Sequence, residues 1–184
     1  GAGDALTRRS NALAGHDRVA KDILAGLRAR TVAEMEEEAH GRVVGPMAGG
    51  ARSVVLYLLN ATAIDLVLKG YSGKSCRWPV PPVETIPKGS EIMLVCESAG
   101  GMLGVADGEC SYGAGPSSQG LGEVVFRASW ETKLVSSSVF YKCGASAGWR
   151  VEREYLTGNQ GRHTSSRLVF TRALSPLIPQ PALP

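Results

Sequence analysis

The sequence lacks a long apolar run and a concentrated stripe of positive charge. Among its 184 residues, no stretch approaches the about 18 consecutive apolar residues that a membrane-spanning helix needs. The formal net charge is only +3, without the basic stripe that marks most DNA-binding domains. We therefore expect neither a helical membrane span nor a nucleic-acid partner.

Motifs for catalysis and metal binding are also missing. The three histidines His16, His40 and His163 lie far from the cysteines, and no two cysteines have the C-x-x-C spacing. The segment Gly70–Ser75 resembles a phosphate loop, but Leu68 occupies the place of the first required glycine. No G-x-S-x-G motif occurs. The sequence thus predicts a protein that is not an enzyme and that holds no cofactor or metal.

Cysteine is sparse, but its count is even. Cys76, Cys96, Cys110 and Cys143 are scattered over a strand-rich region, a pattern typical of two disulfides in a secreted protein, with three possible connectivities. The alternative is that they are buried free thiols of a cytosolic protein. A glycosylation sequon at Asn60–Thr62 lies in an apolar, strand-like stretch and adds little.

What the sequence has in excess is turn-forming residues. It contains 23 glycines and 10 prolines, which indicates many tight turns between short strands. From Arg52 to Ala173 the hydrophobic period is two, and about eight short strands predict a mainly β fold, an antiparallel β-sandwich. The apolar stretch 52–62 predicts a strand covered on both faces, and with "DLVLKG" it predicts a first hairpin. The stretch 149–173 predicts a second hairpin, and the proline-rich Trp78–Pro87 predicts an edge or crossing segment.

The chain divides into three parts. The sequence predicts an N-terminal helical segment and linker over residues 1–45, the β-sandwich over residues 46–174 and a proline-rich tail over residues 175–184. In the first part, apolar residues recur at spacings of three and four opposite a charged face, which predicts an amphipathic helix. The apolar residues that we expect to enter a membrane are Leu13, Val19, Ile23, Leu24 and Leu27.

The order of turns and strands resembles that of the actinoporin-like and aegerolysin cytolysins. The resemblance is carried by "VLYLLNATAIDLVL", "TIPKGSEIMLVCES", "GMLGVADGECSY" and "GEVVFRASWE". It implies a secreted protein whose sandwich docks on lipid and whose N-terminal helix can insert to line a pore, with homo-oligomers on the membrane. Where actinoporins have a Ser-x-Pro headgroup motif and clustered tyrosines, this chain has Ser129-Trp130-Glu131.

Aromatic residues near strand ends complete the predicted site. Rings that are apolar in body and polar at the tip serve lipid interfaces and sugar faces alike. The expected partner is therefore a membrane lipid or a glycan, and the alternative function is a lectin-like or host-directed binding module with the helix packed on the protein. The predicted ligand-binding residues are Trp78, Tyr112, Ser129, Trp130, Tyr141 and Trp149.

Overall fold

The computed structural model describes residues 52–99, 104–116, 118, 121–132, 139–155 and 163–173. Before Arg52 it describes isolated positions, which have helical backbone and are exposed. No helix in the described part is long and apolar enough to span a membrane. The predicted membrane-inserting residues lie outside the described residues, so the amphipathic helix stays a prediction. Those residues are Leu13, Val19, Ile23, Leu24 and Leu27; the described positions are Gly3, Asp4, Thr7, Arg8, Asn11, Ala14, Gly15, Arg18, Lys21 and Asp22.

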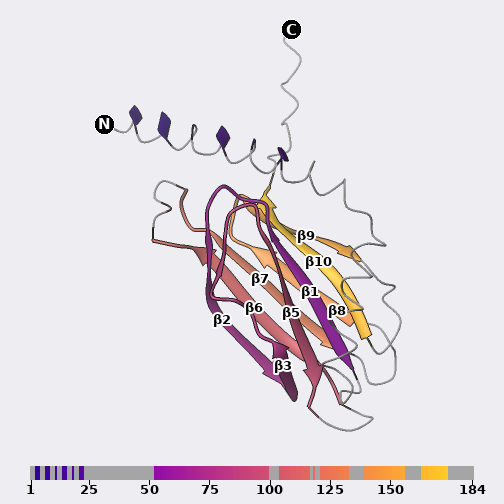
Figure 1. Ribbon diagram of the computed structural model, residues 1–184. Helices are drawn as coiled ribbons and strands as arrows, with labels where there is room; N and C mark the ends of the chain where they lie inside the picture. The colour runs from indigo at the N-terminus through magenta and orange to yellow at the C-terminus, as the bar shows by residue number, and fades with distance from the viewer. Residues whose placement is uncertain are drawn as a thin grey trace.

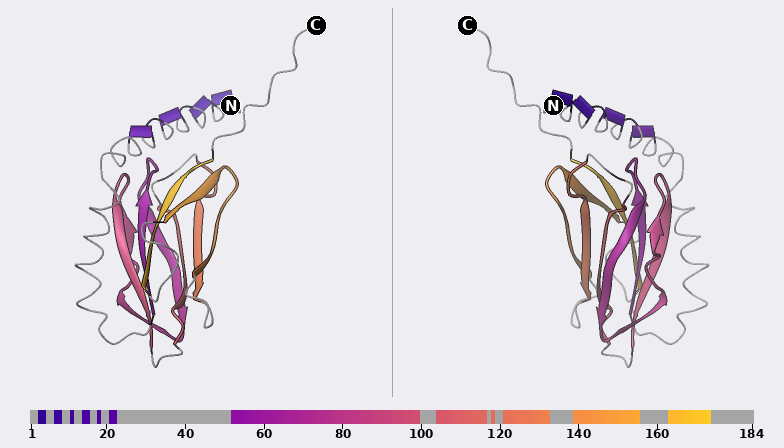
Figure 2. Two further views of the ribbon diagram at one scale, coloured as in Figure 1. Left: turned by 90° about the vertical axis from the view of Figure 1, so that its right-hand side faces the viewer. Right: turned by 90° about the vertical axis from the view of Figure 1, so that its left-hand side faces the viewer.

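The described residues form ten strands in two sheets that lie face to face as the layers of a sandwich (Figure 1, Figure 2). Sheet A has the strand order β3-β5-β1-β10-β9, and sheet B has the order β4-β2-β6-β7-β8. The predicted mainly β sandwich is confirmed. The strands are β1 Ser53–Asn60, β2 Leu66–Lys74, β3 Cys76–Val80, β4 Thr85–Ile86, β5 Glu91–Ser98, β6 Asp107–Ala114, β7 Val125–Thr132, β8 Val139–Ala145, β9 Trp149–Tyr155 and β10 His163–Arg172.

The expectation of a purely antiparallel sandwich is wrong at one pair, because β1 and β10 run parallel. The predicted first hairpin is also wrong, since β1 belongs to sheet A and β2 to sheet B. The composition of β1 accounts for its central place in sheet A, because the strand is buried along its whole length. A strand that is apolar on both faces fits the centre of a sheet, and here β5 and β10 occupy both of its edges.

The proline-rich segment crosses between the sheets, as predicted. β3 lies at the edge of sheet A, and β4, a few residues later, lies at the edge of sheet B. Proline has no backbone donor, so an edge is where it can be accommodated. These two short strands account for the difference between the ten strands observed and the about eight predicted. The second hairpin is confirmed, because β9 pairs antiparallel with β10.

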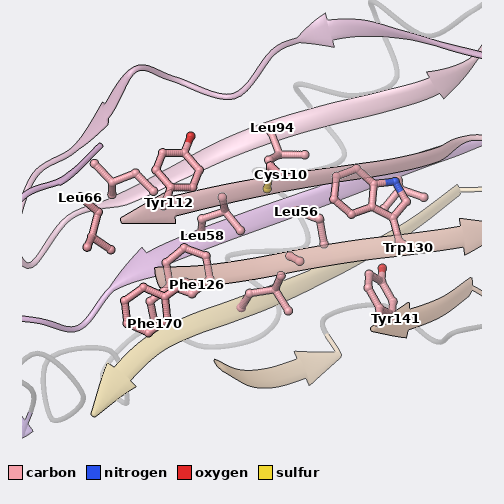
Figure 3. Close-up of a cluster of buried hydrophobic side chains, with 14 of the residues drawn as sticks. Leu56, Leu58, Leu66, Leu94, Cys110, Tyr112, Phe126, Trp130, Tyr141 and Phe170 are labelled. Carbon is pink, nitrogen blue, oxygen red and sulfur yellow. The ribbon is translucent and has the colours of Figure 1, made fainter. Parts of the chain in front are cut away.

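The main core lies between the two sheets, where side chains of β1, β5 and β10 meet those of β2, β6 and β7 (Figure 3). Its centre includes Phe126 of β7 stacked on Phe170 of β10, with ring centroids 4.8 Å apart. In β7 the burial alternates strictly, with Phe126, Ala128 and Trp130 inside and Arg127 outside. Sheet B therefore has one apolar face in the core and one polar face directed outward.

Asn60 joins the two layers at the end of β1. Its side-chain amide donates to the carbonyl oxygens of Ile64 (2.8 Å) and Ile86 (2.9 Å), and its side-chain oxygen accepts from the Thr62 hydroxyl (2.5 Å) and backbone amide (3.1 Å). Asn60 is fully buried. The sequon is thus part of the packing, and in the folded protein its amide nitrogen is not accessible for glycosylation.

All four cysteines are free thiols in the structure, so neither of the two expected disulfides is present in it. Cys110 and Cys143 pair with Ala128 from opposite sides, so a whole strand separates them. Two strand spacings amount to about 9.5 Å, which exceeds the Cα separation that a disulfide allows. The remaining close pair is Cys76 and Cys96, on the neighbouring strands β3 and β5.

Burial of the thiols makes stability sensitive to alkali. Desolvation raises the pKa of Cys110 from 9.0 to about 12, with smaller contributions from Cys143 and Glu109. At a pH below its pKa in the unfolded chain, the Cys110 thiol is neutral in both the folded and the unfolded state. Between that pKa and the higher pKa of the folded state, the thiol ionises only in the unfolded chain. We expect the unfolding free energy to fall by up to about 1.4 kcal/mol per pH unit for this group above about pH 9.

Urea unfolding under reducing conditions at about pH 8 and about pH 10.5 measures this loss. The unfolding free energy of Cys110→Ala should differ less between the two pH values than that of the wild type. Ser111→Ala, on the same strand, should show the same difference as the wild type. An equal pH dependence in the wild type and Cys110→Ala would contradict the assignment.

Candidate functional site

An open groove of about 620 Å³ lies on the outer face of sheet B, across β2, β6, β7 and β8. It is lined by three successive residues from each of these four strands. Cys110 and Ala128 are the middle residues of their groups of three and face the core, so the residues before and after them on each strand face outward. The lining residues are Gly70, Tyr71, Ser72, Glu109, Cys110, Ser111, Arg127, Ala128, Ser129, Lys142, Cys143 and Gly144.

The strand register arranges the outward residues in two rows. One row consists of small residues with Arg127, and the other contains the charged pair Glu109 and Lys142 at either side of Ser129. Neighbours in a row are about 4.8 Å apart, and diagonal neighbours about 7–8 Å. The first row is Gly70, Ser111, Arg127 and Gly144; the second is Ser72, Glu109, Ser129 and Lys142.

Small side chains keep the groove open. A Cβ atom built at Gly70 or at Gly144 would have no heavy atom within 4 Å, so the space above both glycines is empty. Ser129 donates to the carbonyl oxygen of Lys142 (3.1 Å), and Ser72 donates to Glu109 (2.8 Å). These hydrogen bonds hold the serine hydroxyls close to the surface of the sheet, and the longer charged side chains on both sides of them extend further from it.

Charges of both signs line the groove. Arg127 and Lys142 are exposed, and neither forms an ion pair with another described residue. Lys69 lies on the same side, its Cε 2.7 Å from the position that a Cβ on Gly113 would take. Two smaller hollows, of about 280 and 380 Å³, continue the groove at its two ends. The larger of these is lined by the carboxylates Asp107, Glu109 and Glu131 and by Lys74, which pairs with Asp107 across β2 and β6.

One large exposed hydrophobic residue borders this face, and another lies at the edge of the sandwich. Tyr71 is 46% exposed, but it lies in the same row as Cys110, and its ring contacts Trp78 on the core side of sheet B. Phe140, two residues before Lys142 on β8, is 63% exposed. An exposed ring beside polar groups is suited to an interface between water and lipid, since it is apolar in body.

The structure places the predicted ligand-binding residues mostly elsewhere. Ser129 is in the groove, and Trp78 is half-buried between Tyr71 (5.4 Å between centroids) and Trp130 (5.8 Å). The expected exposure of the other four rings is wrong, because strand alternation directs them into the core, where they present no surface to a ligand. They are Tyr112, Trp130, Tyr141 and Trp149, with exposed fractions of 0, 1, 7 and 7%.

The residues that sequence reasoning missed are Glu109, Arg127, Phe140 and Lys142. One signal for Arg127 was available: the period of two in "VFRASWET" puts it on the face opposite the apolar residues. The rest depended on the register of β2 with β6 and of the consecutive strands β6, β7 and β8.

Comparison with known proteins identifies the fold. No family model matches the chain, and no curated protein matches it. Among solved structures, the crystal structure of the lipid binding protein Nakanori is similar, with a TM-score of 0.62, 13% identity and coverage of 83% of this chain and 86% of that one. The fold is shared. IP-1A from Alcaligenes faecalis is similar at a TM-score of 0.42 and 12% identity, over 66% of this chain and 93% of that one.

Proposed function

We propose that this protein binds lipid headgroups at a membrane surface through the groove on the outer face of sheet B. The observation that carries the proposal is an open groove of small residues in which the cations Arg127 and Lys142 lie close to Glu109, beside the exposed ring of Phe140. The fold shared with a lipid-binding protein supports it, as does the resemblance of the sequence to membrane-binding cytolysins.

A zwitterionic headgroup fits this arrangement. Its phosphate would lie near Arg127 and Lys142, and its ammonium group near Glu109. Arg127 and Glu109 are diagonal neighbours across β6 and β7, about 7–8 Å apart at the backbone. Hydrogen bonds to charged groups contribute about 1.5–3 kcal/mol each, so both cations are expected to matter. Phe140 would enter the interfacial layer beside the headgroup.

The test is sedimentation with liposomes of phosphatidylcholine, phosphatidylethanolamine or phosphatidylserine. We expect Arg127→Ala or Lys142→Ala to weaken binding by about 10- to 100-fold, the equivalent of one charged hydrogen bond. Lys88→Ala is the matched control, since Lys88 is an exposed cation in the turn before β5. Wild-type binding in both groove variants, or no binding to any of the three vesicles, would overturn the proposal.

Pore formation, assembly on the membrane and secretion extend this proposal. The N-terminal helix would insert after the sandwich has docked, as the resemblance implies. Vesicles filled with a fluorescent dye separate the two steps in the same experiment, because docking alone sediments the protein and pore formation also releases the dye. The lectin-like alternative would replace the proposal if a glycan array were positive and all vesicles negative.

A further inference from the structure

The corner between β2 and β3 brings two thiols together beside the groove. Cys76 pairs with Ser98 on β5, which makes Cys96 its diagonal neighbour on the same face. Both belong to the main core, Cys96 fully buried and Cys76 partly buried. Besides the burial that raises the pKa of both, each thiol affects the pKa of the other: Cys96 lowers that of Cys76, and Cys76 raises that of Cys96.

The backbone at this corner is shaped around the Cys76 sulfur. A Cβ atom at Gly73 would lie 2.0 Å from that sulfur, so only glycine leaves room for it. Ser75, between them, has a φ of 52°, in the left-handed region that residues other than glycine seldom adopt. A glycine and a strained serine thus direct the Cys76 thiol inward, towards Cys96.

We propose that Cys76 and Cys96 form an oxidisable pair that closes to a disulfide and alters the rim of the groove. Diagonal neighbours lie about 7–8 Å apart at Cα, slightly beyond the usual disulfide range, so β3 must shift for the bond to form. β3 can do so because it is an edge strand whose pairing with β5 is irregular between Arg77 and Val80.

The reaction is a thiol–disulfide exchange with a small disulfide such as oxidised glutathione. The Cys76 thiolate attacks it and releases one thiol; the Cys96 thiolate then attacks the sulfur of Cys76 and releases the second. The two cysteines are oxidised by two electrons in total, and the small disulfide is reduced to two small thiols. The protons of the two cysteine thiols end on these small thiols. Burial raises the pKa of both cysteines, Cys96 more strongly, so the reaction is slow at neutral pH and faster in alkali.

The effect on the groove passes through Trp78, and this part of the inference rests on the proposed function. Trp78 lies two residues after Cys76 and contacts Tyr71 edge-on at 5.4 Å and Trp130 at 5.8 Å. Tyr71 lies between Gly70 and Ser72, which line the groove. A shift of β3 therefore moves the ring that supports Tyr71 and with it this edge of the groove, and we expect lipid binding to weaken by roughly threefold.

The experiment incubates the full chain with oxidised glutathione and then counts its thiols under denaturing conditions. We expect two of the four thiols to be lost within one molecule. This loss should not occur in Cys76→Ser or in Cys96→Ser, and it should still occur in Cys143→Ser. An unchanged count, or a loss that needs Cys143, overturns the pair. Tryptophan fluorescence should change on oxidation of the wild type and of Cys143→Ser, but not of Cys76→Ser or Cys96→Ser.

Vesicle binding before and after oxidation separates the two proposals. If the reduced protein does not bind, the proposed function fails while the thiol count still decides the pair. If the disulfide forms and binding is unchanged, the coupling to the groove is wrong. Weaker binding in the oxidised wild type, restored by a reducing agent, supports the whole inference.

Discussion

Gly144→Trp should abolish vesicle binding without unfolding the protein. Gly144 pairs with Arg127 across β7 and β8, and the space above it is empty, so an indole there would fill the groove beside the arginine. The backbone at Gly144 does not have a positive φ, so a side chain adds no strain. Because the headgroup would lose its contacts with both cations, we expect binding to weaken by about 100-fold or more.

Gly144→Ala is the matched control for this variant. It adds a side chain at the same backbone position but leaves the groove open, so it should bind vesicles as the wild type does. Both variants should unfold at the same urea concentration as the wild type, which shows that the loss is one of binding. If Gly144→Trp still binds with wild-type affinity, the ligand does not occupy this groove.

Asn60→Ala should lower the unfolding free energy by about 3 kcal/mol, because several buried polar groups lose their partners at about 1–3 kcal/mol each. The carbonyl oxygens of Ile64 and Ile86 and the hydroxyl of Thr62 would all be affected. The link between the end of β1 and β4 would also be lost, and with it a contact between the two sheets.

Thr62→Val provides a graded comparison for Asn60. It removes one hydroxyl and retains the two amide bonds of Asn60, so we expect a loss of about 1 kcal/mol in the same urea titration. A change of less than about 0.5 kcal/mol in Asn60→Ala would mean that water replaces the network and that the sheets are joined by the apolar core alone.

Local patterns predicted much of this fold. The alternation in β7, the hairpin of β9 and β10, and the edge position of the proline-rich segment all follow from the period of two and from the lack of a donor on proline. The same alternation puts Trp130 on the side of Phe126, which is the core side. Its burial was therefore present in the sequence, although the ring was predicted to be exposed.

Long-range pairing is what the sequence could not supply. The neighbours of β1 are β5 and β10, and no local signal indicates that a strand at residue 53 lies parallel to one at residue 163. The groove depends on register instead: Glu109, Arg127 and Lys142 lie on the consecutive strands β6, β7 and β8 and come together only through the exact pairing of these strands. Each is individually an ordinary charged residue on a solvent-facing strand.

The pairing of β1 with β10 also determines when this domain can form. Ser53 contacts His163, which follows it by 110 residues. During synthesis, β1 therefore leaves the ribosome long before the strand that covers one of its edges. Its unbroken apolar sequence stays incompletely paired until β10 has been synthesised, so this domain should fold slowly and with a need for protection from aggregation on the way.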